Sequence, residues 1–280
     1  MTPELSQKLA AAVDAMPAFP KSVQRILELT RDVNCSPKDL VQVIDHDPVV
    51  MVKILKVVNS AYYALPRKIT SSNHAVVHLG FNSIKNLALS IAAIGMLPPS
   101  KAAGFDAQQY LLHSLSTAGL ARKIALRLDD ADPMDCFTAG LLHDFGKAVF
   151  AQFMPEEFGQ ALSRCQASGE SLHQVLQQTL GVDHAVVGAM LAEKWRFAPP
   201  LVETIRNQHG AALRDTEMVA CVFAANQISK KLAFGSGGNP CIEALTPAME
   251  RRLGGDLDQL VTKLGDLTQV FDEAQIFAKL

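Results

Sequence analysis

The sequence predicts an all-α protein built from two packed helical lobes, and three observations support this. Helix-start signals recur along the chain, and apolar residues return at the spacing of one helical face. No run alternates between apolar and polar residues and then ends in a hairpin turn, as a half-buried strand would. With 280 residues and 49% hydrophobic side chains, the chain is long and apolar enough to bury a core.

The first hundred residues contain several clear helix signals. The N-terminal segment has apolar residues at helical spacing, namely Leu5, Leu9 and Val13. Ser36 precedes Pro37, which places a capping hydroxyl before a proline at the first helical position. Asp47 and Pro48 repeat this arrangement. The most apolar run, residues 87–97, is predicted to be a buried core helix. We therefore expect an N-terminal helical lobe over residues 1–100.

Helices are also predicted through the rest of the chain. The stretch PPSKAAG, residues 98–104, is typical of a linker, and a helix follows it with apolar residues at Leu111, Leu115, Leu120, Ile124 and Leu128. Ala198-Pro199-Pro200 introduces another helix. The stretch GSGGNP, residues 235–240, is predicted to be a flexible loop. We expect a second helical lobe over residues 101–215 and a helical C-terminal extension over residues 216–280.

Composition argues against several classes of function. The formal net charge is −2 and no block of lysine and arginine stands out, so we expect no nucleic-acid partner. Residues 87–97 are too short to span a bilayer, and the N-terminus lacks the features of a signal peptide, so we expect no membrane association. The five widely spaced cysteines include no C-x-x-C, which favours free thiols in a reducing compartment. We therefore expect a cytoplasmic protein.

Four histidines and one aspartate could form a metal site. His143 and Asp144 are adjacent in LLHDFGK, with Lys147 one helical turn later, and the other candidate ligands are His113, His184 and His209. Imidazoles with a carboxylate suit iron, manganese, zinc or nickel. Lys147 is a candidate catalytic residue, which would hold a phosphate oxygen if the protein is active.

The spacing of these residues also allows a plainer interpretation, in which each histidine only packs in a core. We extend that interpretation to the remaining four histidines. His78 is expected to be a core or turn residue, whereas His46, His74 and His173 are expected to face solvent.

Several longer motifs resemble the HDOD domain, the signalling relative of the HD and HD-GYP phosphohydrolases. The matching stretches are MPAFPKSVQRILEL, VIDHDPVVMVKILKVVNSAYY, ITSSNHAVVHLGFNSIKNLAL, HSLSTAGLA, FTAGLLHDFGK and GVDHAVVGAMLAEKW. The resemblance covers about residues 10–215 and implies an HD-domain-like helical bundle in the second lobe. It also implies that His113, His143, Asp144, His184 and His209 correspond to the metal ligands of the catalytic relatives.

Residues at the family's marker positions are predicted to have structural roles. Asp47 would cap a helix, and Asn59 would tie down free backbone groups where that helix ends. Gly80 suits a helix end that needs a positive φ.

The sequence departs from the catalytic relatives at two points. The position of their closing aspartate corresponds to Asn226, which brings a neutral oxygen in place of a charged one. The Gly-Tyr-Pro element is missing after His209. The resemblance therefore favours a signal-transduction module that binds a protein partner or a small effector, with a degenerate metal site. The alternative is a metal-dependent phosphohydrolase acting on a phosphoester, nucleotide or cyclic dinucleotide.

Overall fold

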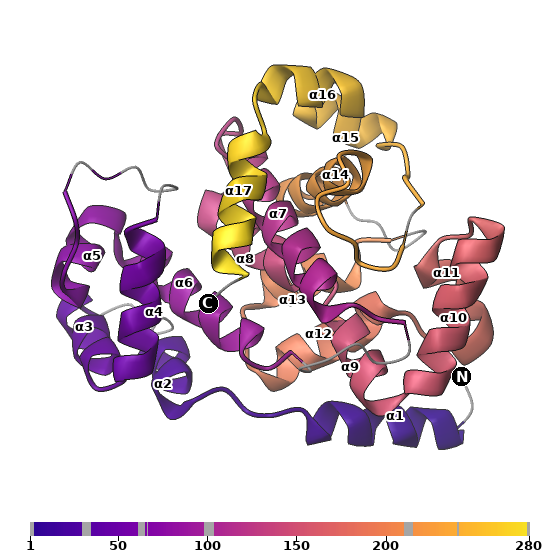
Figure 1. Ribbon diagram of the computed structural model, residues 1–280, viewed down its shortest axis with the longest axis horizontal. Helices are drawn as coiled ribbons and strands as arrows, with labels where there is room; N and C mark the ends of the chain where they lie inside the picture. Colours follow the sequence, from indigo (N-terminus) through magenta and orange to yellow (C-terminus); the bar gives the residue numbers. More distant parts are fainter. Residues whose placement is uncertain are drawn as a thin grey trace. The chain divides into compact units, whose positions relative to one another are not determined.

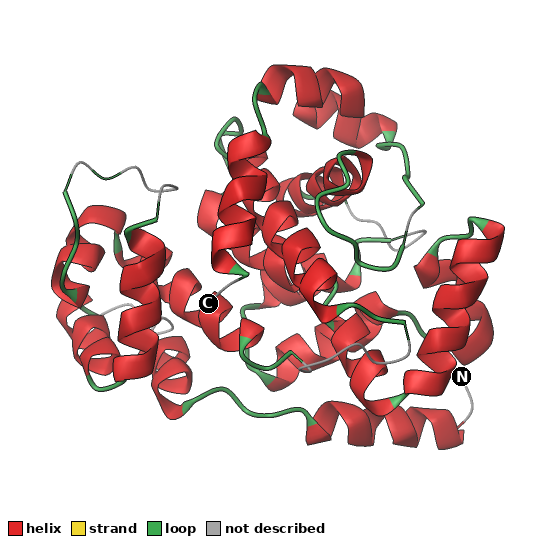
Figure 2. Cartoon of the chain, in the orientation of Figure 1, coloured by secondary structure: helices red, strands yellow, loops and turns green. Residues whose placement is uncertain are grey.

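The computed structural model is helical throughout the part of the chain that it describes, which comprises residues 3–29, 35–60, 65, 67–97, 104–209, 215–239 and 241–278. No strand occurs within these ranges, so the predicted all-α class is confirmed (Figure 2). The predicted linker falls almost entirely on residues 98–103, which lie outside the described residues. Among the described helices, none combines the length and the apolar character that crossing a bilayer requires.

The chain forms two compact units. The first comprises residues 1–16 and 97–267, and the second comprises residues 17–96 and 268–280. The predicted domain division at residues 100 and 215 stays a prediction.

The second unit is a small group of helices, some of which have side-chain caps. Its helices are α2 (Lys21–Leu29), α3 (Pro37–Asp45), α4 (Pro48–Val58), α5 (Ser72–Leu79), α6 (Phe81–Ile94) and α17 (Thr268–Phe277). The carboxylate of Asp47 accepts the backbone N–H of Val50, which confirms the predicted cap of α4. Leu87, within the predicted core helix, is buried in α6. Gly80 ends α5 with a φ of 80°, a conformation that favours glycine.

Asn59 at the end of α4 has the predicted structural role. Its side-chain amide donates to the carbonyls of Leu55 and Ile69, and its side-chain oxygen accepts the backbone N–H of Ile69. Two of these hydrogen bonds join the end of the helix to Ile69, ten residues further along, and the third returns to the helix at Leu55. This explains the polar residue without any role in chemistry.

The first unit contains the longest helix and a dense core. Its helices are α1 (Pro3–Ala15), α7 (Ala107–Ala125), α8 (Pro133–Leu142), α9 (Gly146–Phe153), α10 (Pro155–Ser168), α11 (Leu172–Leu180), α12 (His184–Lys194), α13 (Pro199–Arg206), α14 (Glu217–Lys231), α15 (Pro247–Leu253) and α16 (Leu257–Leu264). Helices α7, α8 and α14 pack against one another (Figure 1). Residues beyond 215 therefore supply a central helix of this unit.

Candidate functional site

The predicted ligands come from four regions of the first unit. His113 lies within α7, and His143 and Asp144 follow directly after the last residue of α8. His184 begins α12, where the carboxylate of Asp183 caps the helix. His209 lies just after α13. Except for the adjacent pair, each side chain reaches the site from a different helix, so tertiary packing brings them together.

Two close helix contacts, each made at a glycine, hold these helices in place. A Cβ on Gly140 of α8 would lie 2.9 Å from the Cα of Ala118, which is in α7. A Cβ on Gly146 of α9 would lie 2.0 Å from the backbone oxygen of His184 and 2.7 Å from the backbone nitrogen of Gly188. A side chain at either glycine would push the helices apart. The glycines therefore allow the ligand-bearing segments to approach.

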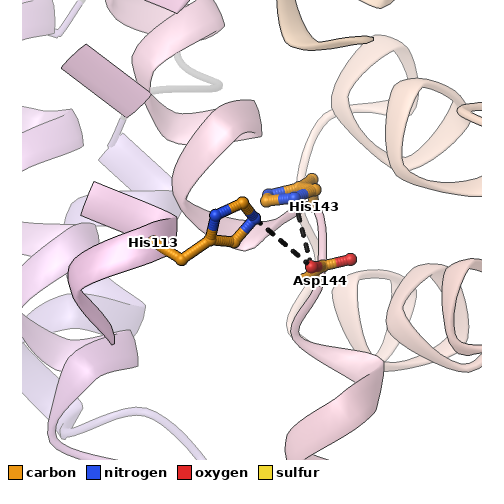
Figure 3. Close-up of side chains that lie close together, drawn as sticks. All are labelled: His113, His143 and Asp144. Carbon is orange, nitrogen blue, oxygen red and sulfur yellow. Dashed lines mark ion pairs between the residues drawn. The ribbon is translucent and has the colours of Figure 1, made fainter. Parts of the chain in front are cut away.

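Asp144 is the centre of the cluster. Its Oδ2 lies 3.8 Å from Nε2 of His113 and 3.3 Å from Nε2 of His143 (Figure 3). Its Oδ1 lies 3.1 Å from Nε2 of His184, and that nitrogen lies 3.1 Å from Nε2 of His209. The structure thus brings together all five residues that were predicted from the sequence.

The remaining ring nitrogens of two histidines are held by protein groups. Nδ1 of His143 donates to the backbone oxygen of Gly140 at 2.6 Å. Nδ1 of His113 lies 3.2 Å from Oγ of Ser229, whose hydroxyl donates to the carbonyl of Phe234 and so accepts from the imidazole. Each ring therefore has a proton on Nδ1 and directs Nε2 toward Asp144, which is the arrangement found in histidines that bind metals.

Burial controls the electrostatics of the site. It lowers the pKa of His113 and of His209 well below the ordinary value, and it also lowers the pKa of His184, so these rings are neutral at neutral pH. Burial opposes ionisation of Asp144, but the neighbouring His143 and Lys147 hold the pKa of that carboxyl well below its usual range. The cluster thus offers the neutral imidazoles of His113, His184 and His209 beside a carboxylate.

These residues fit a divalent metal ion. Within the described ranges, Nε2 of His113, Nε2 of His143 and Oδ1 of Asp144 are buried without a hydrogen-bond partner. Buried polar atoms of this kind call for a partner that the protein itself does not supply. Ligand atoms of His113, His143 and Asp144 lie within 4.8 Å of one another, and so do those of Asp144, His184 and His209. Both groups share Asp144. The identity of the metal stays a prediction.

Lys147 and the loop of residues 235–239 lie directly against this cluster. The ammonium group of Lys147 forms an ion pair with Oδ2 of Asp144 and donates to the backbone oxygen of Gly237 at 2.9 Å. A Cβ on Gly237 would lie 3.0 Å from Oδ2 of Asp144 and 3.1 Å from Cδ2 of His113. The backbone N–H of Ser236 donates to the carbonyl of Gln109 at 3.0 Å. This segment, predicted from its composition as a flexible loop, therefore covers the candidate ligands.

Sequence reasoning misplaced two histidines. His173 was expected to face solvent, but its ring is buried and stacks against that of His209, with ring centroids 4.5 Å apart. His78 was expected in a core or turn, but it is exposed on α5 because the buried face of that short helix is formed by other residues.

Sequence reasoning also missed three residues near the cluster. Ser229 orients His113, whereas Lys230 and Glu243 had been given no role. No local motif marks any of them, because they approach the site only through the packing of α14 and of the segment after it. Asn226 is buried on α14, one helical turn before Ser229, and its Oδ1 has no hydrogen-bond partner in the described part of the chain.

The fold and the buried cluster define an all-α protein with a candidate histidine–aspartate metal site. The HDOD domain model matches residues 16–211, and the chain therefore belongs to the HDOD domain family. A solved HDOD domain protein of unknown function from Geobacter sulfurreducens superposes with a TM-score of 0.80 at 22% identity, over 98% of this chain and 97% of that chain.

Two further relatives are similar over most of the chain. A structure from Shewanella amazonensis SB2B, provisionally named a phosphohydrolase, has a TM-score of 0.75 at 24% identity and covers 97% of both chains. An uncharacterized protein of Treponema pallidum (strain Nichols) is 28% identical over 241 residues, which are 85% of this chain and 46% of the relative. The chain thus spans less than half the length of that relative. The two structural likenesses support the fold alone.

Proposed function

We propose that this HDOD protein is a signal-transduction module that acts by binding a protein partner or a small effector and does not turn over a phosphoester. The observation that carries this proposal is that the loop of residues 235–239 covers the cluster. The side chains of His143 and His184 have 0% exposure, and Lys147 is bound on one side to Asp144 and on the other to the carbonyl of Gly237. A phosphodiester could reach these groups only after the loop of residues 235–239 had moved.

Asn226 supports the same proposal. Where a catalytic relative would place a carboxylate, this chain places a neutral amide, which cannot act as a base and contributes no charge to an ion. A cluster with a single carboxylate holds a divalent ion less tightly than one with two. The residues would therefore form a weak metal site, which is consistent with a domain whose output is binding.

The second candidate function is a metal-dependent phosphohydrolase, and the unpartnered Nε2 atoms around Asp144 favour it. The name of the Shewanella amazonensis structure points in the same direction. A bound metal ion would lower the pKa of its water to about 7 and so supply a hydroxide nucleophile. Lys147 would hold a phosphate oxygen, for which its ammonium group must first leave the carbonyl of Gly237. Neutral imidazoles and Asp144 would hold the ion.

Steady-state hydrolysis distinguishes the two functions. The full chain is supplied in turn with Fe²⁺, Mn²⁺, Zn²⁺ and Ni²⁺, and the substrates are cyclic di-GMP and bis(p-nitrophenyl) phosphate. We expect negligible turnover that is the same in the wild type and in His143→Ala. Robust turnover that disappears in His143→Ala would exclude the signalling module as proposed and establish the hydrolase.

A further inference from the structure

A second group of possible ligands lies beside the cluster and involves residues that the proposed function does not use. We infer that His173, His209 and Glu243 form a separate metal-ion subsite of the class that takes zinc. This subsite shares only His209 with the group around Asp144. The inference does not depend on whether the protein hydrolyses a phosphoester.

Three segments of the first unit meet at this subsite. His173 is the second residue of α11, His209 lies just after α13, and Glu243 lies between the loop of residues 235–239 and α15. One ligand atom from each lies within 4.8 Å of the other two. Two hydrogen bonds attach the third segment to α14: the backbone N–H of Glu243 donates to Oε1 of Gln227 at 2.9 Å, and Lys230 donates to the carbonyl of Cys241 at 3.1 Å. The carboxylate is therefore held near the two rings.

The three residues lack other partners for the atoms concerned. In the part of the chain that the structure describes, Nδ1 of His173, Nδ1 of His209 and Oε1 of Glu243 are buried without a hydrogen bond. Nδ1 of His173 lies 3.9 Å from Oε1 of Glu243, which is too long for a hydrogen bond. Two ligands that are each about 2.1 Å from a tetrahedral zinc ion lie about 3.4 Å apart. The observed separation is thus closer to that of two ligands of one ion.

The arrangement of the rings indicates what must change when an ion binds. The rings of His173 and His209 are nearly parallel, with an interplanar angle of 4°. The lone pair of an imidazole lies in the ring plane, so both rings can bind one ion only if one of them turns out of the stack. Nε2 of His209 is already directed at His184, which leaves its Nδ1 for the subsite. His209 can therefore connect the two groups.

The subsite is more exposed to solvent than the cluster around Asp144. The side chain of Glu243 is 26% exposed, whereas that of Asp144 is 1% exposed. Two histidines and a glutamate supply three ligands, and zinc sites with three protein ligands keep a fourth position for water or another group. Because Glu243 follows the covering loop in the chain, an ion bound there would also fasten that loop beside the cluster.

Zinc binding by substituted proteins tests the inference. The full chain is stripped with chelator and titrated with Zn²⁺, and bound metal is measured by calorimetry and by elemental analysis after desalting. Co²⁺ is used in parallel, because its visible absorption reports coordination. The subsite is removed by Glu243→Gln and, separately, by His173→Gln. Asp144→Asn alters only the group of ligands around Asp144, and His78→Gln is the control at an exposed histidine.

We expect Glu243→Gln and His173→Gln to lose one equivalent of Zn²⁺, or to bind it at least about a hundredfold more weakly, because loss of a neighbour that merely orients a ligand already costs 10- to 100-fold. Asp144→Asn and His78→Gln should keep that equivalent. Zinc binding that is unchanged in Glu243→Gln, or a wild type that binds no zinc, would overturn the inference. Glu243 is partly exposed, so its variant decides the question if His173→Gln does not fold.

Discussion

At the scale of single residues, Asp144 lies against His113, His143 and His184, so the charge available to an ion bound among these three rings depends on it. Asn226 lies on the same helix as Ser229, which orients His113. The two positions are three residues apart and share one face of α14. We therefore expect a carboxylate at position 226 to act on the cluster.

Asn226→Asp is expected to raise the affinity for Mn²⁺ or Zn²⁺ by about tenfold or more, because a charged ligand replaces a neutral one. The free energy of binding should become more favourable by about 1.4 kcal/mol or more. Calorimetric titration measures the change. Asn226→Ala, which supplies no oxygen, is the matched control and should not gain affinity. Equal affinities in the Asp and Ala variants would show that this position does not face the ion.

Lys230 gives the protein a distinct dependence on alkaline pH. Burial, together with the charge of Lys147, lowers the pKa of Lys230 from 10.5 to about 8. Between these two pKa values the unfolded chain holds the proton and the folded chain does not. Burial of the charged ammonium group therefore lowers the free energy of unfolding by its full amount below pH 8, and this loss of stability disappears as the pH rises toward 10.5. The limiting slope is about 1.4 kcal/mol per pH unit.

We therefore expect the free energy of unfolding of the wild type to rise relative to that of Lys230→Met between pH 8 and 10.5. Urea denaturation of both proteins at several pH values measures the difference between their free energies of unfolding. The other lysines are common to both proteins, so their titration cancels in this difference. A difference that does not change with pH would show that Lys230 is solvated in the folded state.

At the scale of helices, the geometry of the site depends on how closely α9 approaches α12. Glycine within a helix normally lowers stability, by roughly 0.5–1 kcal/mol relative to alanine. Gly146 is nevertheless required, because a Cβ there would lie 2.0 Å from the backbone oxygen of His184. Backbone atoms cannot move aside as the end of a flexible side chain can.

Gly146→Ala is accordingly expected to lower the free energy of unfolding by at least about 3 kcal/mol, at the upper end of the range for overpacking. Gly95→Ala is the control, because a Cβ at Gly95 makes only an ordinary contact of 3.4 Å with the carbonyl of Ala92. Chemical denaturation gives both values. If Gly146→Ala were as stable as the wild type, the two helices would not approach each other as described.

At the scale of the whole molecule, the two units can be followed separately by spectroscopy. The chain has a single tryptophan, Trp195, which is buried at the end of α12 in the first unit. Its fluorescence therefore reports on the unit that contains the candidate metal ligands, whereas far-ultraviolet circular dichroism reports on the helices of both units.

Added Mn²⁺ or Zn²⁺ should move the thermal transition seen by Trp195 to higher temperature, because an ion that binds only the folded state at 100 times its Kd adds about 2.7 kcal/mol. In His143→Ala/Asp144→Ala the shift should be lost. A double variant that keeps the shift would place the metal elsewhere. Absence of a shift in the wild type at millimolar metal would identify the His143–Asp144 pair as a structural remnant.

Much of the architecture and of the candidate site could be predicted from the chain alone. Asp47 and Asn59 act as their local sequence predicts, because capping involves atoms a few residues apart. The motif LLHDFGK pointed to His143, Asp144 and Lys147 for a similar reason: one helical turn relates the three. The resemblance to HDOD domains then predicted the distant partners of this motif.

The tertiary structure decided which of the remaining residues meet. His173 and Glu243 carry no local signal, yet packing brings them to His209 from two other segments. The loop of residues 235–239 has a composition that indicates local freedom, but its neighbours are Asp144 and Lys147, about ninety residues earlier in the chain. The sequence by itself determined the helices, their ends and the family, because these depend on interactions within a few residues. Only the packing of the first unit decided that the loop of residues 235–239 covers the cluster and which residues contact each histidine, because those contacts join residues far apart in the chain.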